Sequence, residues 1–276
     1  MSDIRKYINI LNESSNKQPL KEAIEAHGEE LVAYCIVVAE EYVKLPNLEM
    51  RALKAWEDLL EHNEKMLQKI LKKVNIIYTK EDPYKNQREM MYDIIKNNTM
   101  RIFKTPSDDS HPGMTAAEND VFRALHDFVG HHLPNQKEFV KYLAKHNIKS
   151  TSDENFKKYR FNKNSFTVRG EMNTYFSHGK LLSDKVKPAL FTEIVGQICT
   201  YFTTGDFTVN KVAFMDGVDY NKLGKFTDPK LTQRKEKYLE LLKDDSVEKF
   251  DTELGTFSKS SIRWNLLSRG EGQTRK

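Results

Sequence analysis

Residues 115–134 read TAAENDVFRALHDFVGHHLP, and this stretch carries the clearest local structure signals in the chain. Thr115 followed three residues later by Glu118 is a capping box. In this motif the threonine hydroxyl accepts a hydrogen bond from the glutamate N–H, and the glutamate carboxylate accepts one from the threonine N–H. The pattern therefore predicts a helix that begins at Ala116. Pro134 lacks a backbone donor and is predicted to end this helix.

Six further segments have apolar residues at helical spacing and predict helices. Their approximate bounds are 20–42, 48–74, 86–96, 169–182, 188–202 and 229–243. A short connection around Pro46 joins the first two, which favours an antiparallel helical hairpin. Residues 147–167 predict an exposed loop, and residues 207–214 a strand or extended segment. The expected fold class is mainly α, a helical bundle-like core with an N-terminal helical hairpin.

The length of 276 residues is long for one domain and short for two. We expect an N-terminal helical region (1–100), a core region (101–215) and a C-terminal helix with a basic tail (216–276). The net charge of +4 is too small to indicate a nucleic-acid partner by itself. No apolar run reaches the ~20 residues of a membrane helix, and two cysteines cannot form a disulfide scaffold. We therefore expect a soluble cytoplasmic protein with no membrane partner.

The clustering of histidines is the main functional signal. Six of the eight histidines lie between positions 111 and 178. Three predicted helices each place an acidic residue and a second polar residue on one face, at separations of four or seven positions. The pairs are Asp127 with His131, Glu171 with His178, and Glu193 with Gln197. Metal sites in helical bundles are built from such side chains projecting inward from facing helices.

Carboxylates combined with imidazoles suit zinc, manganese or iron better than calcium, which prefers oxygen ligands alone. The predicted ligands of a divalent metal are Asp127, His131, Glu171 and His178. His126 and Glu193 are the predicted catalytic residues, each as a further ligand or a general base. The H-E-x-x-H motif is absent, and the five-residue separation of His126 and His131 places them on different faces of an α-helix. The alternative is that the pairs are salt bridges and caps on solvated helix faces.

The helix that begins at Ala116 offers free backbone N–H groups at its N-terminus, which favour an anion such as phosphate. His111, in the preceding loop, is placed to reach over this N-terminus. Arg123 and Gln197 are predicted as further contacts of an anion or substrate. These residues indicate a small phosphorylated substrate, or nucleic acid, as the partner.

Two glycines lie inside predicted helices beside polar residues of the predicted site. Gly130 precedes His131, and Gly196 precedes Gln197. Glycine in a helix interior costs ~1 kcal/mol relative to alanine. Each glycine therefore indicates the close approach of another helix or of a ligand.

Residues 124–131 read ALHDFVGH, which resembles the His-Asp segment of HD-domain phosphohydrolases. These are all-helical enzymes, and the resemblance places His126 and Asp127 at their metal-binding doublet. In that family one residue commonly stands between the doublet and a Gly-His pair. Two residues stand there in this chain, which rotates His131. His111 would supply the upstream histidine, and no downstream aspartate is matched.

A broader resemblance, over about residues 100–215, is to uncharacterised proteins encoded by bacteriophages. It rests on the segments HPGMT (111–115), END (118–120), FRA (122–124), HD (126–127), GH (130–131), GE (170–171), His178, TE (192–193) and GQ (196–197). The resemblance implies a phage setting, with the host cytoplasm or the virion as the location. It implies no particular reaction.

Three functions follow as alternatives. The leading expectation is a metal-dependent hydrolase acting on a phosphorylated or nucleotide-like substrate. The second is a di-metal carboxylate centre that activates oxygen. The third is a non-enzymatic phage structural or DNA-associated protein, whose histidines cap helices and whose basic residues between 259 and 276 contact DNA.

Overall fold

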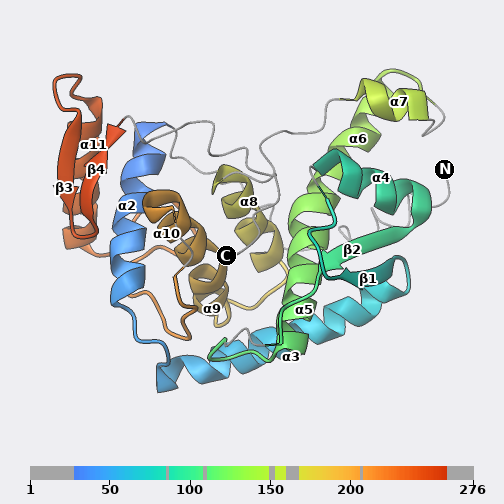
Figure 1. Ribbon diagram of the computed structural model, residues 1–276, viewed down its shortest axis with the longest axis horizontal. Helices are drawn as coiled ribbons and strands as arrows, with labels where there is room; N and C mark the ends of the chain where they lie inside the picture. The colour runs from blue at the N-terminus through green and yellow to red at the C-terminus, as the bar shows by residue number, and fades with distance from the viewer. Residues whose placement is uncertain are drawn as a thin grey trace.

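The computed structural model describes residues 28–84, 87–107, 111–148, 153–159, 168–205 and 208–259. Its architecture is mainly α, as predicted (Figure 1). The beginning of the predicted helix 20–42 and the basic tail beyond residue 259 lie outside the described residues. Within these ranges, no helix combines the length and the apolar character needed to cross a membrane.

The elements follow one another along the chain with few long connections. They are α2 (Glu29–Lys44), η1 (Met50–Ala52), α3 (Leu53–Leu71), β1 (Asn75–Thr79), α4 (Gln87–Asn97), β2 (Thr99–Phe103), α5 (Ala116–Leu125), η2 (His126–His132), α6 (Leu133–Lys145), α7 (Asp153–Lys158), α8 (Val168–Gly179), α9 (Lys187–Phe191), η3 (Thr192–Gly196), α10 (Gln197–Thr204), α11 (Pro229–Lys243), β3 (Lys249–Thr252) and β4 (Gly255–Ser258). The segment η1 is a 3₁₀ turn, whereas η2 and η3 are π-helical.

The two N-terminal helices diverge instead of packing along each other (Figure 1). Helix α2 packs between α10 and α11, whereas α3 packs against α5 and α9. Residues 31–40 are all buried because α2 is covered on two sides. The short connection at Pro46 therefore joins two helices that pack against different partners, and it does not form the predicted antiparallel hairpin.

A small parallel sheet lies at the opposite end of the molecule from α2 (Figure 1). Strands β1 and β2 pair in parallel, from Asn75 opposite Thr99 to Thr79 opposite Phe103, with α4 as the connection between them. Apolar residues of this unit share a core with the C-terminal half of α3 and with α5 and η2. The sequence did not predict these strands, which are short and only partly buried.

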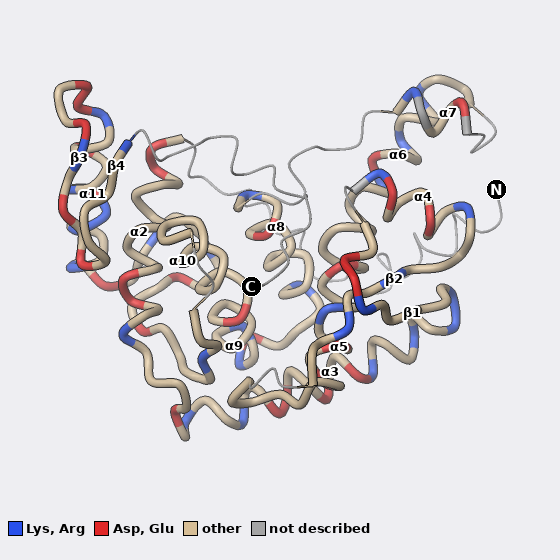
Figure 2. Tube along the Cα trace, in the orientation of Figure 1, with Lys and Arg blue, Asp and Glu red and all other residues tan. Residues whose placement is uncertain are grey.

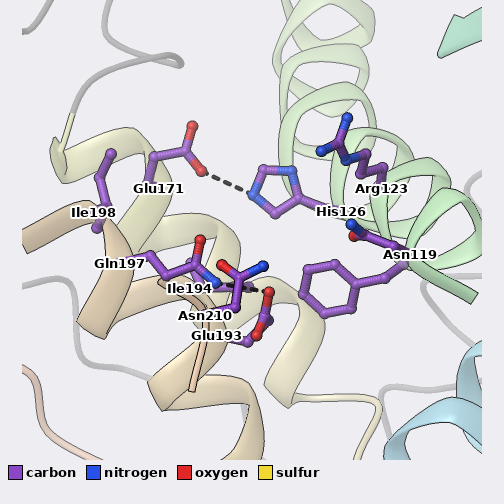
Figure 3. A pocket seen from close by; sticks show the side chains of 10 residues that line it. Asn119, Arg123, His126, Glu171, Glu193, Ile194, Gln197, Ile198 and Asn210 are labelled. Atoms are coloured by element: carbon purple, nitrogen blue, oxygen red, sulfur yellow. Dashed lines mark hydrogen bonds and ion pairs between the residues drawn. The ribbon is translucent and has the colours of Figure 1, made fainter. Parts of the chain in front are cut away.

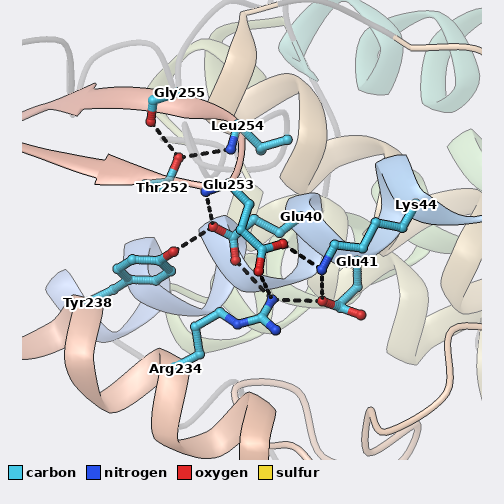
Figure 4. Close-up of polar contacts among 9 residues, drawn as sticks. All are labelled: Glu40, Glu41, Lys44, Arg234, Tyr238, Thr252, Glu253, Leu254 and Gly255. Carbon is cyan, nitrogen blue, oxygen red and sulfur yellow. Dashed lines mark hydrogen bonds and ion pairs between the residues drawn. The ribbon is translucent and has the colours of Figure 1, made fainter.

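A buried carboxylate joins α2 to the C-terminal elements (Figure 4). Glu40 is 0% exposed. Its Oε1 accepts hydrogen bonds from the Tyr238 hydroxyl at 2.6 Å and from the Glu253 backbone N–H at 2.8 Å. Its Oε2 lies 3.1 Å from Nη1 of Arg234. A buried charge needs such donors, so these contacts hold α2, α11 and the β3–β4 hairpin together.

The capping box is present, but the helix that it starts does not end at Pro134. Segments α5, η2 and α6 follow one another without a break and form one long helix (Figure 1). In η2 the hydrogen bonds span five residues, and the Leu133 N–H donates to the Phe128 carbonyl. Because this turn has already changed the hydrogen-bond register, Pro134 occupies the first turn of α6, where its missing N–H costs little.

Candidate metal centre

The π-helical turn η2 brings His126 and His131 together. Their ring centroids are 4.8 Å apart. An α-helix running through both residues would place them on different faces, as was predicted from the sequence. In a π-helical turn, residues five positions apart lie above one another, so the prediction about their faces was wrong.

Glu171 of α8 reaches both imidazoles. Its Oε2 lies 2.8 Å from His126 Nε2, and its Oε1 lies 3.3 Å from His131 Nε2. One ligand atom from each of the three residues lies within 4.8 Å of the others. Ligands held ~2.1 Å from a tetrahedral zinc ion are ~3.4 Å apart, so small adjustments would let these three groups share one ion.

Gly130 permits the approach of α8 on which this group depends. A Cβ atom added to Gly130 would lie 2.0 Å from Cγ2 of Thr174, well inside van der Waals contact. The Thr174 hydroxyl donates to the Gly170 carbonyl within α8, at 3.1 Å. The glycine therefore lets α8 lie close to η2, as its position in the sequence predicted.

Burial and charge act in opposite directions on these side chains. Burial alone would lower the pKa of His126, but the carboxylates of Glu171 and Asp127 raise it to about 10. Burial alone would raise the pKa of Glu171, but the two imidazoles hold it well below its usual range. Without a metal the cluster is therefore an ion pair of imidazolium and carboxylate. A divalent cation would replace the proton on His126.

A second polar group surrounds Glu193 of η3. His111 Nδ1 accepts a hydrogen bond from the Gly113 N–H at 3.0 Å, so the ring hydrogen is on Nε2. That Nε2 lies 3.0 Å from Glu193 Oε2 and donates to it. Gln197 Nε2 donates to the other carboxylate oxygen at 2.7 Å. Both oxygens of Glu193 are thus held by side-chain donors.

His126 and Glu171 of the first group, and Glu193 and Gln197 of the second, line one cavity of about 240 Å³ (Figure 3). Its lining residues are Asn119, Phe122, Arg123, His126, Glu171, Glu193, Ile194, Gln197, Ile198 and Asn210. In Figure 3, His126 and Arg123 enter from the long helix, and Glu193 and Gln197 enter from the helix opposite. Glu171 and Glu193 are the only acidic residues of α8, η3 and α10 (Figure 2).

Two predicted metal ligands do not join the three-residue group. Asp127 has a side chain 29% exposed, and its Oδ1 lies 3.2 Å from His126 Nδ1. Its place is therefore behind the imidazole, where a carboxylate orients a histidine ligand. His178 Nε2 instead contacts Asn63 Oδ1 at 3.1 Å. Seven helical positions span ~10.5 Å along the axis, too far for Glu171 and His178 to share one ion.

The N-terminus of α5, predicted from the sequence to bind an anion, is not open to one. The Glu118 carboxylate already occupies this N-terminus, where it accepts from the Thr115 N–H at 2.7 Å. His111 is buried against Glu193 and does not reach over the helix end. Arg123 does line the cavity, and its guanidinium lies 5.5 Å from the ring of Phe103.

Several lining residues were not singled out from the sequence. Asn119 and Phe122 lie on the face of α5 that leads to His126, at separations of seven and four, and this spacing was a usable signal. Ile194 is an apolar residue within the predicted helix 188–202, which gave no reason to single it out. Asn210 comes from the extended segment after α10, where no periodicity marks it.

Comparison of the chain with models of protein families, with curated proteins and with solved structures finds no match. The geometry of this site is therefore the basis for proposing a function.

Proposed function

We propose that the protein is a metal-dependent hydrolase whose ion is held by His126, His131 and Glu171. The observation that carries the proposal is the meeting of these three side chains, two of which, His126 and Glu171, also line a cavity. Two histidines and one glutamate form the ligand set of several zinc hydrolases, with a position left open for water.

The same cavity supports hydrolysis because Glu193, which also lines it, can serve as the base. A bound divalent ion lowers the pKa of its water toward neutrality. Glu193 would accept a proton from a water beside the ion as the water oxygen attacks the electrophilic centre, and would return that proton to the leaving group as its bond breaks. His111 and Gln197 would fix the carboxylate during this transfer.

A phosphorylated or nucleotide-like substrate is the proposed class. The two charges of the ion exceed the single charge of Glu171, and Arg123 adds a cation beside the cavity. Phosphate esters carry negative charge that grows on the transferred group, and such cations stabilise it.

The test separates metal binding from chemistry. Titration with zinc, manganese and iron(II), monitored by calorimetry and by metal analysis, should give one ion per chain in the wild type. Glu171→Gln should weaken binding at least 100-fold. Glu193→Gln should bind the ion within threefold of the wild type but lose at least 100-fold of its hydrolysis of p-nitrophenyl phosphate esters or nucleotides. Absence of stoichiometric metal, or equal binding by Glu171→Gln, would overturn the proposal.

Two histidines and a carboxylate are also the ligand set of mononuclear iron(II) oxygenases, which gives a second candidate. The di-metal version has less support, because the described residues contain one group of metal-ligating atoms. Iron(II) loading without oxygen, followed by air, separates the candidates. Oxygen consumption and a new visible absorption would favour the oxygenase, whereas zinc-supported hydrolysis without either would favour the hydrolase.

A further inference from the structure

A second and larger cavity lies away from the candidate metal centre, between α4, β2 and α7. Its volume is about 580 Å³, within the range of pockets that take small organic ligands. It shares no lining residue with the metal cavity. Its walls combine the aromatic rings of Tyr84, Tyr92 and Phe156 with charged side chains.

The floor of this cavity is fixed by a buried carboxylate. Asp93 is almost fully buried and accepts hydrogen bonds from the Tyr84 hydroxyl at 2.9 Å and from Asn97 at 2.8 Å. Arg101 also pairs with it through Nη1. The Tyr84 oxygen in turn accepts from the Arg101 backbone N–H at 2.8 Å. The ring of Tyr84 and the guanidinium of Arg101 are thus positioned before any ligand arrives.

Arg101 retains donors for a ligand. Its side chain is 41% exposed, and a guanidinium has five N–H donors, of which Asp93 takes only a part. Arg88 lies on the same cavity, with Nη2 3.4 Å from the Phe156 carbonyl. Glu89 adds an acceptor. The cavity therefore offers donors and an acceptor around an aromatic wall.

The aromatic wall includes one accessible ring. Tyr92 is 38% exposed, and it meets Phe156 edge to face, with centroids 5.4 Å apart and an interplanar angle of 83°. Phe156 is itself buried against Phe139. Tyr92 is therefore a ring that a planar ligand can cover without moving the core.

We propose that this cavity binds a nucleobase, carried by a free nucleotide or by an unpaired segment of nucleic acid. A base has a flat aromatic face that stacks on Tyr92. Its edge carries carbonyl and ring-nitrogen acceptors that match Arg101 and amino donors that match Glu89. Both sources share this chemistry, and the experiment separates them.

The test uses the full chain and two kinds of probe, the four nucleoside monophosphates and a fluorescent single-stranded hexanucleotide. Tyr92→Ala should weaken binding about 5- to 160-fold, the range expected for one lost base-stacking contact. Tyr92→Phe keeps the ring and should bind as the wild type does. Tyr78→Ala is the matched control, because Tyr78 is 39% exposed but lies outside the cavity.

Each outcome decides the proposal. Binding of monophosphates with the Tyr92 dependence would support a free nucleotide, and binding of the hexanucleotide alone would support nucleic acid. Failure of all probes, equal loss in Tyr78→Ala, or equal binding of ribose 5-phosphate would overturn it. Glu171→Gln should leave this binding unchanged, so failure at the metal centre does not affect the result.

Discussion

The two π-helical turns, η2 and η3, have similar local structure but position different side chains. Each lies inside a longer helix and contains a glycine against which a neighbouring side chain packs, Thr174 at Gly130 and Tyr42 at Gly196. In η2 the turn aligns two imidazoles with a carboxylate from another helix. In η3 it presents a carboxylate whose oxygens are already held by donors. One turn therefore gathers two imidazoles beside a carboxylate, and the other holds a carboxylate in a fixed orientation.

The largest effect should come from removing one imidazole of η2. His131→Ala should weaken metal binding at least 100-fold, because it would remove one of the three proposed protein ligands. The neighbouring His132 is the matched control, since its Nδ1 lies 3.1 Å from Met91 Sδ and belongs to another contact. His132→Ala should bind metal within threefold of the wild type, measured by calorimetry. Similar losses of metal affinity in His131→Ala and His132→Ala would contradict a specific role for the imidazole of His131.

The next largest effect is expected from substituting the glycine of each π-helical turn. Gly130→Ala and Gly196→Ala should each lower the free energy of unfolding by about 1–3 kcal/mol, because the added Cβ overlaps Thr174 or the ring of Tyr42. Only Gly130→Ala should also weaken metal binding, by at least tenfold. Denaturant unfolding and metal titration measure the two quantities.

Gly179→Ala is the control for the glycine pair. Its Cβ would lie 3.7 Å from Leu190, an ordinary contact, so stability should stay equal or rise slightly. Retention of full metal affinity by Gly130→Ala would show that the approach of α8 does not depend on the glycine.

A smaller effect concerns His178, which lies on regular α-helix outside both π turns. Burial lowers its pKa to about 3, so it is neutral in the folded protein and protonates near pH 6.5 once unfolded. Its contribution to stability is therefore complete above pH 6.5 and is lost as the pH falls toward 3. Between pH 7 and pH 5 the wild type should lose about 2 kcal/mol more than His178→Gln.

Unfolding at both pH values measures this difference, and metal titration of the same variant sharpens the comparison. His178→Gln should bind metal as the wild type does. Loss of the ion in this variant would return His178 to the ligand set.

The sequence was most informative where a local signal has one structural meaning. The capping box of Thr115 and Glu118 was predicted with its hydrogen bonds, and helix α11 begins at Pro229, as predicted, because Asp228 caps it. The fold class was also predicted. The prediction that Pro134 ends the helix was wrong, because the effect of a proline depends on the hydrogen-bond register of the preceding turn. No local pattern of residues reveals that register.

The site was predicted in part for the same reason. His126, His131 and Glu171 meet, as the expected convergence of separate helices requires, and their metal-binding role stays a prediction. Asp127 and His178 were included because α-helical spacing was assumed across residues that form a π turn or lie two turns away. Which helices face each other depends on long-range packing, such as that of Gly130 on Thr174, and one sequence does not contain that information.

The burial of Glu40 has a consequence for any attempt to shorten the chain. A fragment ending near residue 215 would retain the metal cavity but lose Arg234, Tyr238 and the backbone N–H of Glu253, the donors to that carboxylate. A lone anion would then sit on the apolar helix that supports α10. Truncation at the C-terminal side would therefore destabilise the helices around the cavity, although no described residue beyond 215 lines it.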